Sequence, residues 1–254
     1  MNIIFKSISN EQIGIEVIGW TRSFLPEIQD ELEMVEGLDG AIHLPKPLGM
    51  QTITIKFRAF FSNDTERMQV VDKVAWWLFS RNFEKLELSD EPSIYYMAKV
   101  LDASDLTPEL FTSEFEITFT CQPIKFGEHV EKELIDSNKF INNGTYDKTP
   151  LKITLTMQEY AEVFTVSVNG MEITYDMNEQ PDEEERKPID VGNIVVIDSK
   201  ELEYRVNGKL KVFELSGYFS YLKQGENIIT TSHLADIKVE YQEMYLFNWW
   251  SDMQ

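Results

Sequence analysis

The chain divides into two halves that meet near residue 125. The first half ends in a segment of alternating apolar and polar residues, 114–121, which is closed by Cys121–Gln122–Pro123. Since proline cannot donate a hydrogen bond to a neighbouring strand, we expect the strand to end there. The second half opens at Asn142–Asn143–Gly144 and closes with residues 222–228. A length of 254 residues is enough for two domains of ordinary size. We therefore predict domains at 1–130 and 131–254.

Strict alternation marks the clearest strand of the first half. Residues 51–61 place a row of apolar side chains on one face, namely Ile53, Ile55, Phe57, Ala59 and Phe61. This period of two residues predicts a strand with one face buried. Segment 114–121 alternates in the same way and turns Cys121 inward, so this cysteine is predicted to be a small core residue and not a nucleophile. Residues 86–88 and 95–100 are predicted as further strands.

A helix is predicted between these strands, over about residues 64–81. Asn63 can cap its first turn, and Glu66 can reach back to Asn63. Apolar residues recur at helical spacing, at Met68, Val71, Val74, Ala75 and Leu78. Adjacent helix positions point about 100° apart, so Trp76 and Trp77 cannot both face one core. The two tryptophans are therefore candidate subunit-interface residues, unless both sides of the helix are covered within the domain.

Two segments nearer the N-terminus are predicted to form turns or loops. Residues 3–20 contain short apolar runs around Asn10 and Gly14, which fits a hairpin. Residues 27–40 are acidic and end in Gly37–Leu38–Asp39–Gly40, a typical turn sequence. We expect the acidic segment to be a solvent-exposed loop or edge, because the ligand spacing of a known metal site is not recognisable in it.

The second half is predicted to contain many short strands and little helix. Asn169–Gly170 and Asn207–Gly208 are strong signals for two-residue hairpin turns. Residues 194–198 form a candidate buried strand, and the hydrophilic residues 176–190 are expected to form a surface loop. Many short strands separated by turn signals suggest a β-sandwich. The predicted fold class is therefore mainly β with one helix in the N-terminal domain (α+β), followed by a C-terminal β-sandwich.

Charge and cysteine content exclude several classes of partner. The chain has 44 acidic and 23 basic residues and a formal net charge of −21. This charge repels nucleic-acid phosphates and anionic lipids, so we expect no sequence-specific nucleic-acid binding. Neither a signal peptide nor a run of roughly 20 apolar residues is recognisable, and we expect no membrane insertion. A single cysteine allows neither an intramolecular disulfide nor a cysteine zinc site, which fits a reducing compartment.

Motifs for catalysis, metal binding or cofactor binding are not recognisable. The three histidines, His43, His129 and His233, have no serine, cysteine or second histidine at a motif spacing. Among 44 acidic residues, chance pairs of carboxylates are abundant and do not point to a glycosidase. We therefore predict no catalytic residue, no metal site and no cofactor.

The C-terminal tail is unusually rich in aromatic residues. Tyr245, Phe247, Trp249 and Trp250 are a candidate contact patch, which would stack on a sugar or meet another subunit. Aromatic faces suit either role because they bury a large area at a low cost in entropy. The alternative is a final strand or extension that packs against its own domain.

The order and spacing of several short motifs resemble the distal tail proteins of siphophages, the long-tailed, non-contractile bacteriophages, of Gram-positive hosts. Gly37–Leu38–Asp39–Gly40 resembles a glycine–aspartate–glycine turn of this family, with Leu38 in place of the usual arginine. The remaining motifs follow in the family's order: Trp76–Trp77–Leu78, Tyr95–Tyr96, Phe119–Thr120–Cys121–Gln122–Pro123, Asn142–Asn143–Gly144–Thr145, Ile197–Asp198, Ser216–Gly217–Tyr218–Phe219 and Leu222–Lys223–Gln224–Gly225–Glu226–Asn227.

The resemblance implies a structural virion protein and not an enzyme. The N-terminal domain would form a homohexameric ring, alone or as one of several stacked rings, and the C-terminal domain would be a galectin-like or carbohydrate-module-like β-sandwich. The ring would be the hub that joins the tail tube protein to the tail-tip or tail-associated protein, with an axial channel for DNA passage. The sandwich would offer a platform for receptor-binding proteins. The protein would be assembled in the bacterial host cytoplasm and lie at the distal end of the virion tail.

A carbohydrate-binding adhesin is the alternative function. Its second domain would recognise a host cell-wall glycan, for which sandwiches need exposed aromatic residues beside a few polar groups. The second half has room for a bare sandwich, and an inserted carbohydrate module is not recognisable in it. This length favours the structural role.

Overall fold

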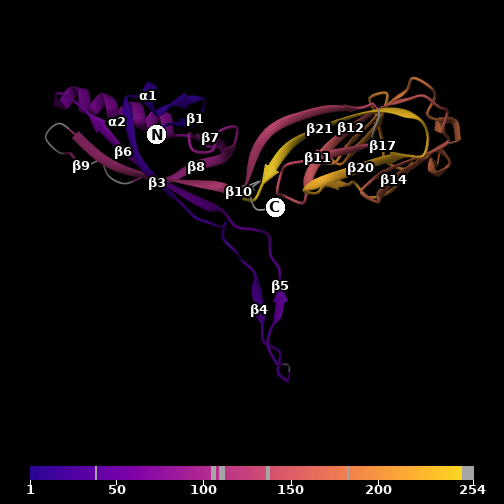
Figure 1. Cartoon of the computed structure of the whole chain (residues 1–254), viewed down its shortest axis with the longest axis horizontal. Helices are drawn as coiled ribbons and strands as arrows, with labels where there is room; N and C mark the ends of the chain where they lie inside the picture. The colour runs from indigo at the N-terminus through magenta and orange to yellow at the C-terminus, as the bar shows by residue number, and fades with distance from the viewer. Residues whose placement is uncertain (38, 104–106, 109–111, 136–137, 182, 248–254) are drawn as a thin grey trace. The chain divides into compact units, whose positions relative to one another are not determined.

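The computed structural model describes residues 1–37, 39–103, 107–108, 112–135, 138–181 and 183–247. Contacts divide the chain into two compact units, Met1–Phe126 and Gly127–Gln254 (Figure 1). Each unit has its own cluster of buried apolar residues, so each has its own core.

The first unit is an antiparallel sheet with one main helix. Its elements are β1 (Ile3–Phe5), β2 (Ile8–Ser9), α1 (Asn10–Ile13), β3 (Ile15–Arg22), β4 (Glu31–Glu33), β5 (Ile42–Leu44), β6 (Gln51–Phe60), α2 (Asp64–Leu78), β7 (Glu84–Leu88), β8 (Tyr95–Ala103), β9 (Thr107–Pro108) and the first part of β10 (Thr112–Leu134). Neighbouring strands follow the order β3–β6–β10–β8–β7–β1–β2, and β9 pairs with β10. The predicted combination of strands and one main helix is confirmed.

The two alternating segments of the first half pair with each other in the sheet. Phe57 of β6 lies opposite Phe115 of β10, and their rings stack at 5.5 Å between centroids. Alternate residues of both strands are buried, as the period of two predicted. Cys121 is fully buried, and burial raises the pKa of its thiol to about 12. This confirms its place in the core and makes it a poor nucleophile.

Pro123 does not end its strand, contrary to our prediction. β10 continues to Leu134 and so passes from the first unit into the second. Its pairing with β8 matches Cys121 to Ala98 but Lys125 to Tyr96, which shifts the register between them. Residues 122–124 therefore bulge out of the ladder. A bulge accommodates proline because a residue there need not donate a hydrogen bond to the neighbouring strand.

The hairpin expected within residues 3–20 is present as β1 and β2, which pair through Phe5 and Ile8, but the stretch from Asn10 to Gly14 is a single turn of helix. The Ser9 side chain accepts a hydrogen bond from the Gln12 backbone, and the Gln12 side chain accepts one from the Ser9 backbone. This reciprocal capping box starts α1, and Gly14 ends it in the left-handed conformation at φ 88°. Four residues are too few to display a helical period, so the apolar runs did not reveal this turn of helix.

Helix α2 begins where predicted and ends earlier, at Leu78 instead of about residue 81. Asn63 accepts the Glu66 backbone hydrogen bond at 2.9 Å, as expected of the cap. The Glu66 carboxylate accepts from the Ser62 backbone and not from Asn63. Phe79 adopts extended backbone angles and ends the helix.

The buried face of α2 is rotated from the predicted stripe. Its buried residues are Val70, Val74, Trp77 and Leu78, whereas Met68 and Ala75 are exposed. The Trp77 ring meets Phe5 and Phe57 edge-on, with centroids 6.2 and 6.1 Å away. Burying an indole removes more apolar surface from water than burying Met68 or Ala75, which accounts for the rotation.

Between β3 and β6 the chain forms a long hairpin, residues 23–48, which we call the arm. β4 and β5 pair with each other in a separate two-stranded sheet, with Leu32 opposite His43 (Figure 1). Every described residue from 27 to 48 is exposed. The predicted solvent exposure of the acidic segment is thus confirmed, although Leu38 of the expected turn lies outside the described residues.

The second unit is a β-sandwich, which confirms the fold class predicted for the C-terminal half. Its elements are the last part of β10, β11 (Lys139–Asn142), β12 (Thr149–Met157), β13 (Val163–Val168), β14 (Met171–Asp176), η1 (Met177–Glu179), η2 (Glu183–Glu185), β15 (Ile194–Asp198), β16 (Glu203–Val206), β17 (Lys209–Lys211), β18 (Leu215–Gly217), β19 (Tyr221–Leu222), β20 (Gly225–Thr231) and β21 (Ala235–Tyr245). One sheet has the order β17–β16–β15–β12–β21–β10 and the other β11–β20–β13–β14–β18. Their buried residues form one core. The galectin-like detail stays a prediction.

Both predicted two-residue turns are present in the sandwich. Asn169 and Gly170 join β13 to β14 with φ of 55° and 87°. Asn207 and Gly208 join β16 to β17 with φ of 47° and 78°. Positive φ at both central positions is the geometry for which asparagine followed by glycine is favoured.

Candidate functional site

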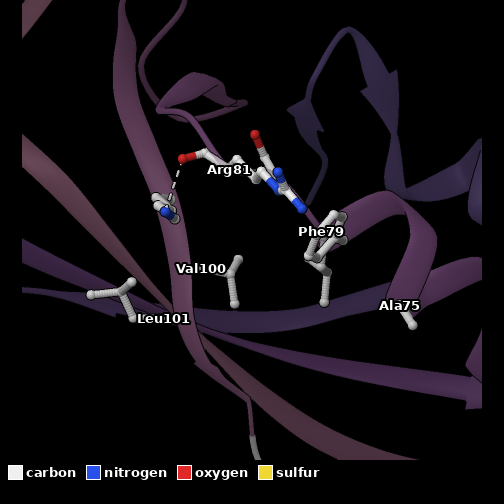
Figure 2. Close-up of a pocket in the computed structure, with 8 residues that line it drawn as sticks. Ala75, Phe79, Arg81, Val100 and Leu101 are labelled. Carbon is white, nitrogen blue, oxygen red and sulfur yellow. Dashed lines mark hydrogen bonds between the residues drawn. The ribbon is translucent and has the colours of Figure 1, made fainter.

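A groove in the first unit collects exposed apolar side chains at the end of α2. It encloses about 710 Å³ and is lined by Ala75, Leu78, Phe79, Ser80, Arg81, Lys99, Val100 and Leu101 (Figure 2). Phe79 and Leu101 are each 69% exposed, and nearby Trp76 is 63% exposed. Large exposed apolar side chains that gather around one groove mark a binding surface.

Two lysines fix the chain that follows α2. The Lys6 ammonium donates to the Phe79 carbonyl oxygen at 2.9 Å and lies 5.7 Å from the centre of the Trp76 ring. The Lys99 ammonium donates to the Arg81 carbonyl oxygen at 3.0 Å, drawn as a dashed line in Figure 2. These bonds satisfy carbonyl groups at the helix end and hold the apolar side chains beside the groove.

The groove is basic in a strongly acidic chain. Lys6, Arg81 and Lys99 form no ion pair with any carboxylate among the residues that the structure describes. Elsewhere the cations are usually paired, as in Arg58 with Glu114 at 2.6 Å. Arg81 and Lys99 in the lining, together with Lys6 on the Phe79 carbonyl oxygen, outnumber the Glu84 carboxylate that accepts a hydrogen bond from Ser80, and this excess of positive charge favours an acidic and partly apolar partner.

The two tryptophans predicted as interface residues separate in the structure. Trp77 is fully buried, and its indole nitrogen donates to the carbonyl oxygens of Phe5 and Ile8. Its selection as a subunit contact was therefore wrong, because its own domain covers it completely. Trp76 is exposed beside the groove, and its role at an interface stays a prediction.

The predicted aromatic patch of the tail is only partly described. Tyr245 ends β21 and donates its hydroxyl hydrogen bond to Glu243 at 2.6 Å. Phe247 is 45% exposed, and its carbonyl oxygen accepts a hydrogen bond from the Thr145 hydroxyl at 2.7 Å. The tail up to Phe247 thus packs against its own unit. Trp249 and Trp250 lie outside the described residues.

Sequence reasoning missed most of the groove. Lys6, Arg81 and Lys99 come from three separate segments, and only the pairing of β1, β7 and β8 brings those segments together. The exposed Phe79 and Leu101 gave no periodic signal of their own. Trp76 was the sole groove neighbour that the sequence pointed to.

The described residues contain no group of three or more His, Cys, Asp and Glu side chains arranged to hold a metal ion. A helix with the length and apolar character needed to span a bilayer is also not found among them. The chemistry that the groove offers is apolar contact and positive charge, which serves binding.

Two family models of phage proteins match successive parts of the chain. A phage tail protein RIFT-related domain matches residues 9–121. The C-terminal domain of siphovirus-type tail components matches residues 143–245. Together they cover most of both units, in the order that the domains have in the chain.

The chain is also similar in fold to a solved structure. The crystal structure of the Dit (gp 19.1) protein of phage SPP1, described as a paradigm of the hub adsorption apparatus in phages infecting Gram-positive bacteria, has a TM-score of 0.75 at 14% identity. The similarity covers 96% of this chain and 98% of that chain. A chain of the phage P2 baseplate, in its activated conformation with calcium, has a TM-score of 0.43 at 9% identity. That similarity covers 97% of this chain and 98% of the baseplate chain. Sequences of curated proteins give no match.

Proposed function

Since this chain belongs to the siphophage distal tail (Dit) protein family, we propose that it forms a hexameric ring at the distal end of the tail. The ring is the hub between the tail tube protein and the tail-tip protein, and its axis is a channel for DNA. The chain is a phage tail component with a structural role, and this function requires neither a cofactor nor a catalytic residue. Assembly takes place in the host cytoplasm.

The observation that carries the ring is the exposed apolar groove of the first unit. Phe79 and Leu101 line the groove and expose more than half of their surface to water, and so does Trp76, whose ring lies near the Lys6 ammonium that bonds the Phe79 carbonyl oxygen. An isolated domain gains nothing from this exposure, whereas a neighbouring subunit that covers the groove gains the free energy of burial. Tryptophan in particular is enriched among the residues that contribute most to protein interfaces.

The charge of the chain supports passage of DNA through the hub. A net charge of −21 repels the phosphate backbone and disfavours tight binding of DNA to the protein. A conduit needs weak interaction with the molecule that moves through it. The charge is shared across the chain, so the support is for weak DNA binding and not for particular lumen residues.

Light scattering across protein concentrations from micromolar upward tests the ring. We expect a mass of six chains, or of a multiple of six, and a shift toward monomer in Trp76→Ala. Phe213→Ala is the matched control, because Phe213 is 70% exposed but belongs to the second unit. A Trp76→Ala variant with the same mass as the wild type would exclude Trp76 from the subunit contact. A strict monomer at every concentration would contradict self-assembly of the ring.

Recognition of a host cell-wall glycan by the sandwich stays a prediction. Of the predicted aromatic patch, Tyr245 is hydrogen-bonded to Glu243 and partly buried, which leaves Phe247 as the exposed ring within the described part of the tail. A single exposed ring is a weak platform for sugar stacking. A glycan array of cell-wall polysaccharides checks this function, and signal at background level would exclude it.

A further inference from the structure

The arm exposes a series of large apolar side chains that its own unit does not cover. These residues are Phe24, Leu25, Ile28, Leu32, Met34, Val35, Ile42, Leu44 and Leu48. Within the part of the chain that the structure describes, the hydrogen bonds and ion pairs of residues 28–48 all stay within the arm. A two-stranded hairpin is at best marginally stable in water without further packing. The arm therefore needs a surface on which to pack.

The arm is also acidic, and its charge is distributed unevenly. The Lys46 ammonium pairs with Glu31, and the Asp30 carboxylate is hydrogen-bonded to the His43 ring at 2.6 Å and to the Lys46 backbone at 2.9 Å, so these two carboxylates already have partners within the arm. Further along, Glu33, Glu36 and Asp39 have no ion-pair partner among the described residues. The outer half of the arm thus presents free negative charge.

Acidic and apolar side chains share one face of this hairpin. Glu33 lies opposite Ile42, and Glu31 lies opposite Leu44 in the antiparallel register. Side chains directly opposite each other point to the same side of a two-stranded ribbon. That face carries negative charge beside apolar surface, which is the complement of a groove with positive charge beside apolar surface.

We propose that the arm of one copy docks in the groove of the next copy, with its carboxylates beside Arg81 and Lys99 and its apolar residues on Phe79 and Leu101. This inference rests on the proposed ring and identifies the contact that builds it. The charges match, since both the arm carboxylates and the groove cations lack partners of opposite sign among the residues that the structure describes. Both surfaces belong to the first unit, so each copy offers one of each.

A contact between two different surfaces of the same chain is heterologous. Such a contact repeats from copy to copy and closes into a ring when its rotation divides a full turn. An arm and a groove on every subunit therefore account for a ring without any contact between two identical surfaces. A ring with an even number of subunits can also be built from two variants in alternation. Each variant alone cannot associate with itself, but the arm of each fits the groove of the other.

This property gives the test. Arg81→Glu puts a negative groove opposite the wild-type arm, and Glu33→Arg puts a positive arm opposite the wild-type groove. Each variant alone is expected to need at least about a tenfold higher concentration than the wild type to reach ring mass, because like charges meet at every contact. An equal mixture of the two variants is expected to recover ring mass at the wild-type concentration, since all contacts in an alternating ring are of opposite charge.

Matched controls come from the second unit. Lys200 and Glu201 are 76% and 61% exposed at the side chain, and Lys200→Glu and Glu201→Arg make the same changes in net charge. These variants are expected to keep wild-type ring mass. A second readout is a disulfide between engineered cysteines. The chain suits this experiment because its one native cysteine, Cys121, is buried. Oxidising a mixture of Ile42→Cys and Leu101→Cys is expected to link the two variants to each other, because Ile42 lies on the same face of the arm as Glu33.

The outcomes separate this inference from the ring itself. If Arg81→Glu and Glu33→Arg each keep ring mass and the engineered cysteines do not link, the arm contacts something other than the neighbouring groove. In that case the inference is overturned while the hub stands. If mixing fails to restore a ring that each variant loses, the charges do not meet and the inference is again overturned. A wild-type protein that stays monomeric throughout overturns both.

Discussion

The ammonium group of Lys125 lies 2.9 Å from the carboxylate of Glu91, and both side chains are at least 90% buried. The Arg22 guanidinium forms a second ion pair with the same carboxylate at 2.7 Å, and the Tyr96 hydroxyl donates a hydrogen bond to it. The four residues come from β3, the turn after β7, β8 and β10. This network therefore joins the middle of the sheet in the first unit to one of its turns.

Removing Glu91 is expected to destabilise the first unit strongly. Glu91→Ala removes the carboxylate that pairs with the buried Lys125, and breaking a buried pair in this way costs about 3–5 kcal/mol. Glu87→Ala is the control, since the Glu87 pair with Lys85 is more than one-third exposed and such pairs contribute at most about 1 kcal/mol. Urea unfolding followed by tryptophan fluorescence measures both. Equal losses in the two variants would contradict a special role for the buried pair.

The same network predicts a loss of stability in acid. Burial alone would raise the pKa of Glu91, but hydrogen bonds from Tyr96 and Lys125 and the charge of Arg22 hold this pKa below its ordinary value of 4.5. A depressed pKa in the folded state adds stability above pH 4.5, and this contribution disappears as the pH falls through the folded value. Glu91→Gln removes the titrating group. Its free energy of unfolding is expected to fall less steeply below pH 4.5 than that of the wild type.

Trp77→Ala and Trp76→Ala are expected to differ sharply in their effect on the free energy of unfolding. Trp77 fills the core against Phe5 and Phe57, and truncating a buried tryptophan costs about 3–5 kcal/mol. Trp76 loses only its contact with Lys6, worth about 0.5 kcal/mol at an exposed site. Thermal unfolding of the two variants measures the difference. A large loss for Trp76→Ala would mean that the monomer depends on this exposed ring.

Alternation was the most dependable signal in this sequence. The buried faces of β6 and of β10 up to Cys121 follow directly from a period of two residues, because a strand turns successive side chains to opposite sides. The two asparagine–glycine turns were equally direct, since their positive φ values suit few other residue pairs. These features depend on neighbours in sequence, which the sequence displays.

Features that depend on distant residues were not predictable. The predicted strand ended at Pro123. In the structure a bulge accommodates this proline, and the bulge is seen only from the pairing of β10 with β8. The apolar spacing of α2 favoured Met68 and Ala75, whereas packing against β1 and β6 selects Trp77. At the groove, Lys6 and Lys99 bind carbonyl oxygens of the chain just after α2. These contacts depend on the order of the strands in the sheet, which the sequence does not display.

Gly217 and Gly170 provide a contrast that tests the packing of the sandwich. Both have positive φ, 101° and 87°, so alanine at either position costs about 1 kcal/mol in backbone strain. A Cβ atom at Gly170 would meet nothing within 4 Å, but at Gly217 it would lie 2.2 Å from the Glu172 carbonyl oxygen. That oxygen accepts the Tyr218 backbone hydrogen bond at 2.9 Å, so it cannot move away without cost.

Gly217→Ala is therefore expected to lower the free energy of unfolding by about 2–4 kcal/mol, and Gly170→Ala by about 1 kcal/mol. The loss expected for Gly217→Ala is larger because the new Cβ atom would force β14 and β18 apart, in addition to the strain of positive φ that both variants share. Thermal unfolding followed by circular dichroism measures both variants against the wild type. Equal shifts in the two variants would show that β18 is free to separate from Glu172, in which case this edge of the second sheet would contribute little to the stability of the sandwich.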